Sequence, residues 1–158
     1  DVGTCYGGYY GDAACTYPVG RISRERQRLI DVTLESLNRA IAEAKDGNTI
    51  GDIGHAVESY VIGNGFGLVR DYTGHGLGMH LHEPPQVPNF GHPGRGVTLK
   101  AGMTIAIEPM VMSGAEDTIV GSDRWVVLTA DGSDAAHFER SVLITKDGAE
   151  VLTPWKWA

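Results

Sequence analysis

The 158-residue sequence has few cysteines, no long apolar run and no excess of basic residues. Its two cysteines, Cys5 and Cys15, are too few for the disulfide framework of a small secreted domain. We therefore expect both to be free thiols, buried as small hydrophobic residues in a reducing compartment. No apolar stretch reaches the about 20 residues that cross a bilayer, and the start carries no signal-peptide pattern. These absences predict a cytoplasmic protein without a membrane partner.

Acidic residues outnumber basic ones, 20 against 13, and the formal net charge is −7. A phosphate-binding surface needs clustered Lys and Arg, so we expect no nucleic-acid specificity. The acidic charge is either a solvated surface or is partly gathered at a cation site. Length and composition predict one folded domain over residues 1–158. Because the chain starts with Asp inside a strand-like run, we expect this domain to be N-terminally truncated.

The order of elements favours an α+β fold. Residues 1–16 are expected to form a β-hairpin around Gly7-Gly8, with Gly3 opposite Asp12. Residues 23–45 and 52–62 have helical periodicity, and Thr49 with Asp52 approaches a capping box. Extended structure is predicted for residues 66–79, a loop for 84–98, and strands for 97–99, 104–112, 125–129, 138–145 and 150–153. Asp131-Gly132 indicates a hairpin turn between two of these strands.

Residues 74–85 form the most distinctive segment, with three histidines and a carboxylate within nine residues. Glycines flank His75 and allow a ligand or another backbone to come close. His80 and His82 alternate, so they share one face of an extended segment. The pattern suits a metal or proton-transfer site, and a structural or surface role is equally open.

Five ionisable residues sit in apolar or Gly-rich strands where a lone charge is costly: Asp1, Asp12, His75, Glu108 and Glu139. A buried carboxylate is usually paired with a base or bound to a metal. Arg140 follows Glu139 directly and so points to the other strand face. Four carboxylates and one imidazole fit a pair of divalent ions better than one, with Mn, Fe, Co and Zn all suitable. Two such ions would activate a bridging water for hydrolysis.

Four sequence features occur in the order found in a known enzyme family. They are the Asp pair eleven residues apart, Gly-His-Gly-Leu-Gly before His82-Glu83, the Thr-Ile-Ala-Ile-Glu-Pro-Met segment at 104–110, and Phe138-Glu139-Arg140. Over essentially its whole length the chain resembles metal-dependent aminopeptidases of the pita-bread fold, and most of all the type I methionine aminopeptidases. The resemblance implies a single metallopeptidase catalytic domain, with a curved antiparallel sheet and helices on its outer face, incomplete at the N-terminus.

The resemblance also implies a metal site. Asp1 would chelate one ion, while Asp12 and Glu139 would bridge both. His75 and Glu108 would hold the other ion, and Glu108 would also relay a proton in catalysis. The cofactors implied are two divalent metal ions, without a choice among Mn, Fe, Co and Zn.

Further positions match residues that contact substrate in the family. His82 would act in catalysis near the scissile bond, the alternative being a hydrogen-bonded strand histidine. Trp125 would line the methionine side-chain pocket, the alternative being a core tryptophan, and Leu81 takes a pocket position that is often Phe. His80 and His137 match no ligand position and are expected to lie at the surface or behind the ligands. His137 stands two residues before Glu139 on the same strand face, so we expect it to reach the edge of the site. His55 and His92 are expected to be exposed.

The function implied is removal of N-terminal methionine from nascent polypeptides, by attack of a hydroxide that bridges two metal ions. The expected partner is the N-terminus of a nascent peptide, with ribosome association as a further hypothesis and a monomer as the expected state. Two alternatives stay open. One is an Xaa-Pro aminopeptidase or prolidase on the same fold, and the other is a catalytically inactive relative or fragment that acts as a binding protein.

Overall fold

The computed structural model describes residues 1–154, which form two helices and twelve strands. The helices are α1 (Arg24–Glu43) and α2 (Ile50–Gly63). The strands are β1 (Val2–Tyr6), β2 (Tyr9–Ala13), β3 (Gly67–Leu68), β4 (Gly74–Gly76), β5 (Glu83–Val87), β6 (Thr104–Ile107), β7 (Met110–Met112), β8 (Thr118–Val120), β9 (Val127–Thr129), β10 (Ala135–His137), β11 (Arg140–Ile144) and β12 (Ala149–Val151).

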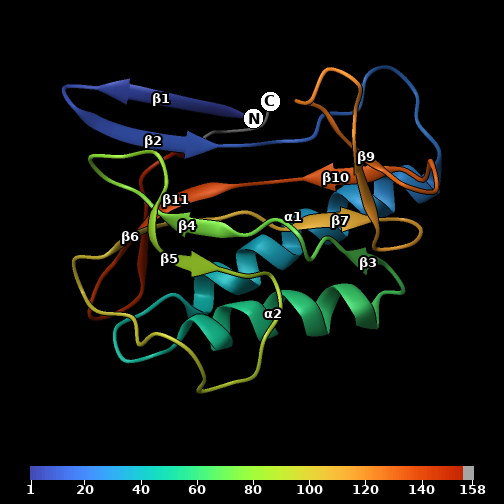
Figure 1. The fold of residues 1–158 in the computed structure, drawn as a ribbon. Coiled ribbons are helices and arrows are strands. Elements are labelled where there is room, and N and C mark those ends of the chain that lie inside the picture. The colour runs from blue at the N-terminus through green and yellow to red at the C-terminus, as the bar shows by residue number, and fades with distance from the viewer. Residues whose placement is uncertain (155–158) are drawn as a thin grey trace.

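All the strand pairs are antiparallel. Five strands form one sheet in the order β12-β11-β6-β4-β5, and β10-β7-β3 form a second. The pairs β1-β2 and β8-β9 are separate hairpins. Helix α2 lies on the opposite side of the strand layer from the β1-β2 hairpin (Figure 1). This arrangement confirms the predicted α+β class.

Helix α1 begins beside the predicted residue 23, whereas α2 begins at Ile50, two residues before the predicted start and directly after Thr49 of the predicted capping box. The Ser23 hydroxyl accepts a hydrogen bond from the Arg26 N–H at 3.2 Å and caps α1. Asp52 accepts from the Thr49 N–H at 2.7 Å, which completes the predicted capping box of α2. The helices pack against each other and bury apolar side chains such as Leu37 and Ile53 in the core.

The first hairpin has the predicted register. Gly7 and Gly8 adopt φ values of 60° and 88°, which favour glycine, and Gly3 pairs with Asp12. Both cysteines are free thiols, as expected. The expectation that both are buried was wrong for Cys5, because β1 lies at the surface and its residues are exposed.

Two predictions around the site were wrong in detail. Residues 84–87 form a strand rather than a loop. Proline is tolerated here because β5 is an edge strand, and one side of an edge strand needs no N–H donors for a neighbouring strand. The predicted strand 104–112 is two strands, β6 and β7, which belong to different sheets. Pro109 has no N–H to donate and marks the break. Glu108 therefore sits at the junction of the two sheets.

The strand predicted at 97–99 is reduced to a single bridge between Thr49 and Thr98. Gly132 adopts a turn with φ of 74°, but the strands on either side do not pair with each other as predicted. Strand β9 pairs with β8, and β10 pairs with β7. Within residues 1–154, neither helix is long and apolar enough to cross a membrane.

Candidate metal centre

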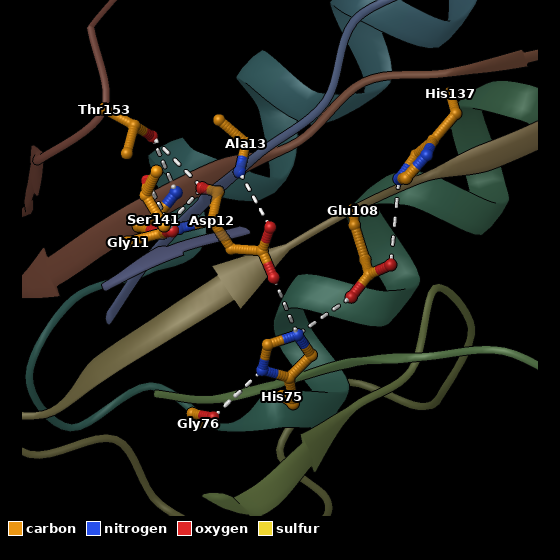
Figure 2. Close-up of polar contacts among 10 residues, drawn as sticks. Gly11, Asp12, Ala13, His75, Gly76, Glu108, His137, Ser141 and Thr153 are labelled. Atoms are coloured by element: carbon orange, nitrogen blue, oxygen red, sulfur yellow. Dashed lines mark hydrogen bonds and ion pairs between the residues drawn. The ribbon is translucent and has the colours of Figure 1, made fainter. Parts of the chain in front are cut away.

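Four of the predicted metal ligands come from separate strands or strand ends that the sheet brings together. Asp12 lies on β2 and His75 on β4, whereas Glu108 follows β6 and Glu139 precedes β11. Strand β6 lies between β4 and β11, so Ala106 pairs with His75 on one side and with Ser141 on the other. Figure 2 shows the side chains of Asp12, His75 and Glu108 pointing toward one another.

The side chains are within reach of a shared ion. His75 Nε2 lies 3.7 Å from Asp12 Oδ2 and 3.5 Å from Glu108 Oε1. One ligand atom each from Asp12, His75 and Glu139 lies within 4.8 Å of the others, and all three residues are buried. Oxygen-rich donor sets with some nitrogen suit Mn, Fe, Co and Zn. The geometry therefore fits at least one divalent ion at this group.

The pKa values of the ligand group indicate that a nearby cation would stabilise its ionised carboxylates. Burial, and secondarily the charge of Asp12, raises the pKa of Glu108 to about 8. Burial, together with Glu108 and Asp12, raises the pKa of Glu139 to about 9. Burial lowers the pKa of His75, so its imidazole is neutral and able to bind a metal. Among residues 1–154, Glu139 Oε1 is a buried oxygen with no hydrogen-bond partner. A buried, unpaired carboxylate oxygen is costly, and a bound cation would compensate for that cost.

Hydrogen bonds to the main chain of the ligand residues and their neighbours hold the ligands in place. Ser141 Oγ contacts both the N–H and the C=O of Asp12. The Glu139 N–H donates to the Ala14 carbonyl at 2.9 Å, and Asn89 Nδ2 donates to the Glu108 carbonyl at 3.0 Å. Sequence reasoning missed these supports, because Ser141 and Asn89 are buried polar residues whose partners are distant in the chain.

A cavity of about 570 Å³ opens beside the ligand group. Four predicted site residues line it: Asp1, His82, Glu108 and Trp125. Asp1 is exposed and lies outside the buried ligand group. His82 is also exposed, and its ring centroid lies 4.4 Å from that of His75. Trp125 is 87% exposed, which excludes a core tryptophan.

Leu81 lies outside the residues that line this cavity and instead stands beside β1. A Cβ placed on Gly3 would be 3.2 Å from Leu81 Cδ1. His55, His80 and His92 are exposed, as expected for the first and last of them.

His137 reaches the site, as its position on the face of Glu139 predicts. Its Nε2 lies 3.7 Å from Glu108 Oε2, and the residue lines the cavity. Burial is the main cause that lowers the pKa of His137 to about 4, so its ring is neutral at pH 7. The contact with Glu108 itself is a consequence of the β7–β10 pairing.

Comparison with known proteins gives consistent results. The sequence pattern of metallopeptidase family M24 matches residues 1–146. Methionine aminopeptidase 1 of Bacillus subtilis is 47% identical over 153 residues, which cover 97% of this chain and 62% of that protein. The chain thus spans about 60% of the length of the curated relatives it matches.

Solved structures have the same fold, which confirms the predicted pita-bread architecture. The methionine aminopeptidase of Thermotoga maritima superposes with a TM-score of 0.93 at 50% identity, covering 95% of this chain and 60% of the other. The prolidase of Pyrococcus furiosus gives a TM-score of 0.74 at 26% identity, covering 98% and 40%. Both sequence and structure are more similar to the first of these two.

Proposed function

The chain belongs to metallopeptidase family M24, and we propose that it carries the metal centre of a methionine aminopeptidase. The proposed metal ligands are Asp1, Asp12, His75, Glu108 and Glu139. The observation that supports this most is the buried group of Asp12, His75 and Glu139, with Glu108 beside it and one oxygen unpaired. We propose two divalent ions, because the four carboxylates and one imidazole of this ligand set exceed what one ion needs beside a bound substrate.

A pair of divalent ions, when bound, polarises the scissile carbonyl and lowers the pKa of a bound water toward neutrality. The residues of the chain would hold the ions and transfer protons. We propose that Asp12 and Glu139 would be shared between the two ions. Glu108 keeps one oxygen toward His75 and directs the other toward His137, so it can accept a proton and return it to the leaving amine.

The cavity fits the proposed substrate, a peptide with a free N-terminal methionine. Apolar side chains, among them Met110, Met112 and Val127, line it and suit a methionine side chain. His82 lines the cavity with its ring beside that of His75, and it is proposed to contact the scissile bond. Trp125 is proposed to cover the methionine side chain.

Leu81 is proposed to contact substrate only on the strength of the resemblance, since it stands outside the cavity lining. We propose the N-terminus of nascent peptides as the partner and the cytoplasm as the location. Ribosome association and a monomeric state stay predictions, as do the domain boundaries at 1–158.

Hydrolysis of short peptides tests the proposal. The chain is incubated with Met-Gly-Met or Ala-Pro peptides and Mn(II) or Co(II), with EDTA as the control. We expect metal-dependent release of methionine and little cleavage of Ala-Pro. Preferential cleavage of Ala-Pro would indicate a prolidase. Absence of any cleavage by a folded, metal-loaded chain would favour a binding role.

A further inference from the structure

We propose that His137 is a positioning residue for Glu108, with its Nε2 donating a hydrogen bond to the outer oxygen of that carboxylate. The inference rests on the proposed metal centre. It assigns to His137 a role that the ligand set alone does not give it.

Glu108 is flanked by two imidazoles, one at each carboxylate oxygen (Figure 2). Oε1 lies 3.5 Å from His75 Nε2, on the side of the ligand group. Oε2 lies 3.7 Å from His137 Nε2, on the opposite side. A hydrogen bond from His137 Nε2 to Oε2 would restrict rotation about the Cγ–Cδ bond and keep Oε1 directed toward His75.

The main chain of His137 is fixed on both sides. Its N–H donates to Thr16 Oγ1 at 2.9 Å, and the same hydroxyl donates to its carbonyl at 2.9 Å. In the sheet His137 pairs with Met110, which follows Glu108 by two residues. The β7–β10 register and the hydrogen bonds to Thr16 therefore position the imidazole beside Glu108.

The ring nitrogen that faces Glu108 needs a partner. Within residues 1–154, His137 Nε2 is one of three buried side-chain polar atoms without a hydrogen bond. An unpaired buried nitrogen is unfavourable. A displacement of less than about 1 Å brings the 3.7 Å separation into hydrogen-bond range, and such contacts often tighten when a site is loaded. Removal of an outer partner of a metal ligand typically lowers metal affinity by about 10- to 100-fold.

Titration of the chain with Mn(II), followed by calorimetry, tests the assignment. The variants are His137→Ala, His137→Phe, which keeps a ring without nitrogen, and His137→Gln, whose amide can donate. His55→Ala, an exposed histidine on α2, is the matched control. We expect Ala and Phe to weaken one Mn(II) equivalent by about 10- to 100-fold and leave the other unchanged. Gln should restore most of the affinity, and the control should bind as the parent chain does.

The outcomes separate the two proposals. A parent chain that binds no Mn(II) contradicts the metal centre, and with it the basis of the inference. A parent chain that binds two ions, with Ala and Phe variants that bind them equally well, overturns the role of His137 alone. Unchanged binding with a raised KM for Met-Gly-Met would also overturn it, because His137 would then contact the peptide. If the Ala variant fails to fold, as judged by circular dichroism, the comparison of Phe with Gln decides.

Discussion

The hydroxyl of Ser141 spans the main chain of Asp12, accepting from its N–H at 3.0 Å and donating to its C=O at 2.8 Å. These bonds join residues 129 positions apart and hold β2 against β11. Both ends of the contact are buried. The Ser141 hydroxyl thus helps to fix the position of one proposed bridging ligand, and Thr153 Oγ1 also donates to the Asp12 carbonyl, at 3.5 Å.

Ser141→Ala should destabilise the chain, because it removes the acceptor of the buried Asp12 N–H and one of the two donors to the Asp12 carbonyl. We expect a loss of about 1–3 kcal/mol in the free energy of unfolding, measured with urea. Thr4→Ala is the control, since it removes an exposed hydroxyl that bonds to Gly11, and should change stability by less than about 0.5 kcal/mol. Equal, small effects of the two substitutions would contradict the proposed role of Ser141.

Stability of the metal-free chain should fall as pH rises above neutrality. The pKa values of Glu108, about 8, and Glu139, about 9, lie above the ordinary value of 4.5. Between these limits the folded chain binds more protons than the unfolded chain, so the free energy of unfolding decreases with pH. His137, with a pKa lowered from 6.5 to about 4, and His75, whose pKa is also lowered, act in the opposite direction, mainly below about pH 7. From about pH 6.5 to about pH 8.5 the loss should be about 2 kcal/mol per pH unit.

Urea unfolding in EDTA at three pH values measures this slope. Glu139→Gln removes one of the two titrating groups and should flatten the slope. Saturating Mn(II) should abolish or reverse it, because a bound cation requires ionised ligands. A metal-free chain that gains stability from pH 6.5 to pH 8.5 would be incompatible with buried, protonated carboxylates.

Trp125→Ala should affect catalysis rather than folding. The side chain is 87% exposed and lines the cavity, so its loss should change stability by less than about 0.5 kcal/mol. We expect kcat/KM for Met-Gly-Met to fall about tenfold, equivalent to about 1.4 kcal/mol of transition-state binding. Tyr6, an aromatic residue 93% exposed and outside this cavity, is the control. Equal turnover by both variants would remove Trp125 from the substrate pocket.

Local patterns in the sequence predict much of the fold. The Gly7-Gly8 turn determines the register of Gly3 against Asp12, and the Thr49 cap marks the start of α2. Which strand lies at the edge of a sheet, and which strands pair, cannot be predicted from local sequence patterns. Pro84 and Pro85 indicate a loop until β5 is known to be an edge strand, and the pairing of β8 with β9 depends on the tertiary structure.

The same distinction applies to the site. Glu108 and Glu139 stand out in the sequence because a lone carboxylate in an apolar strand is costly. Their convergence with Asp12 and His75 was expected, and the structure brings these four side chains together. The contact made by Ser141 has no signal in spacing or composition. The two-residue spacing of His137 and Glu139 predicts that His137 reaches the site, but its contact with Glu108 depends on which strands pair.

Metal stoichiometry tests the central claim most directly. The chain, stripped with EDTA, is dialysed against Mn(II) or Co(II), and bound metal is counted per chain for the parent, Asp12→Asn and Glu139→Gln. We predict two ions for the parent and one or none for either variant, with His55→Ala unchanged and all four chains folded. Equal metal content in the parent chain and both ligand variants would contradict a dinuclear centre built on Asp12 and Glu139.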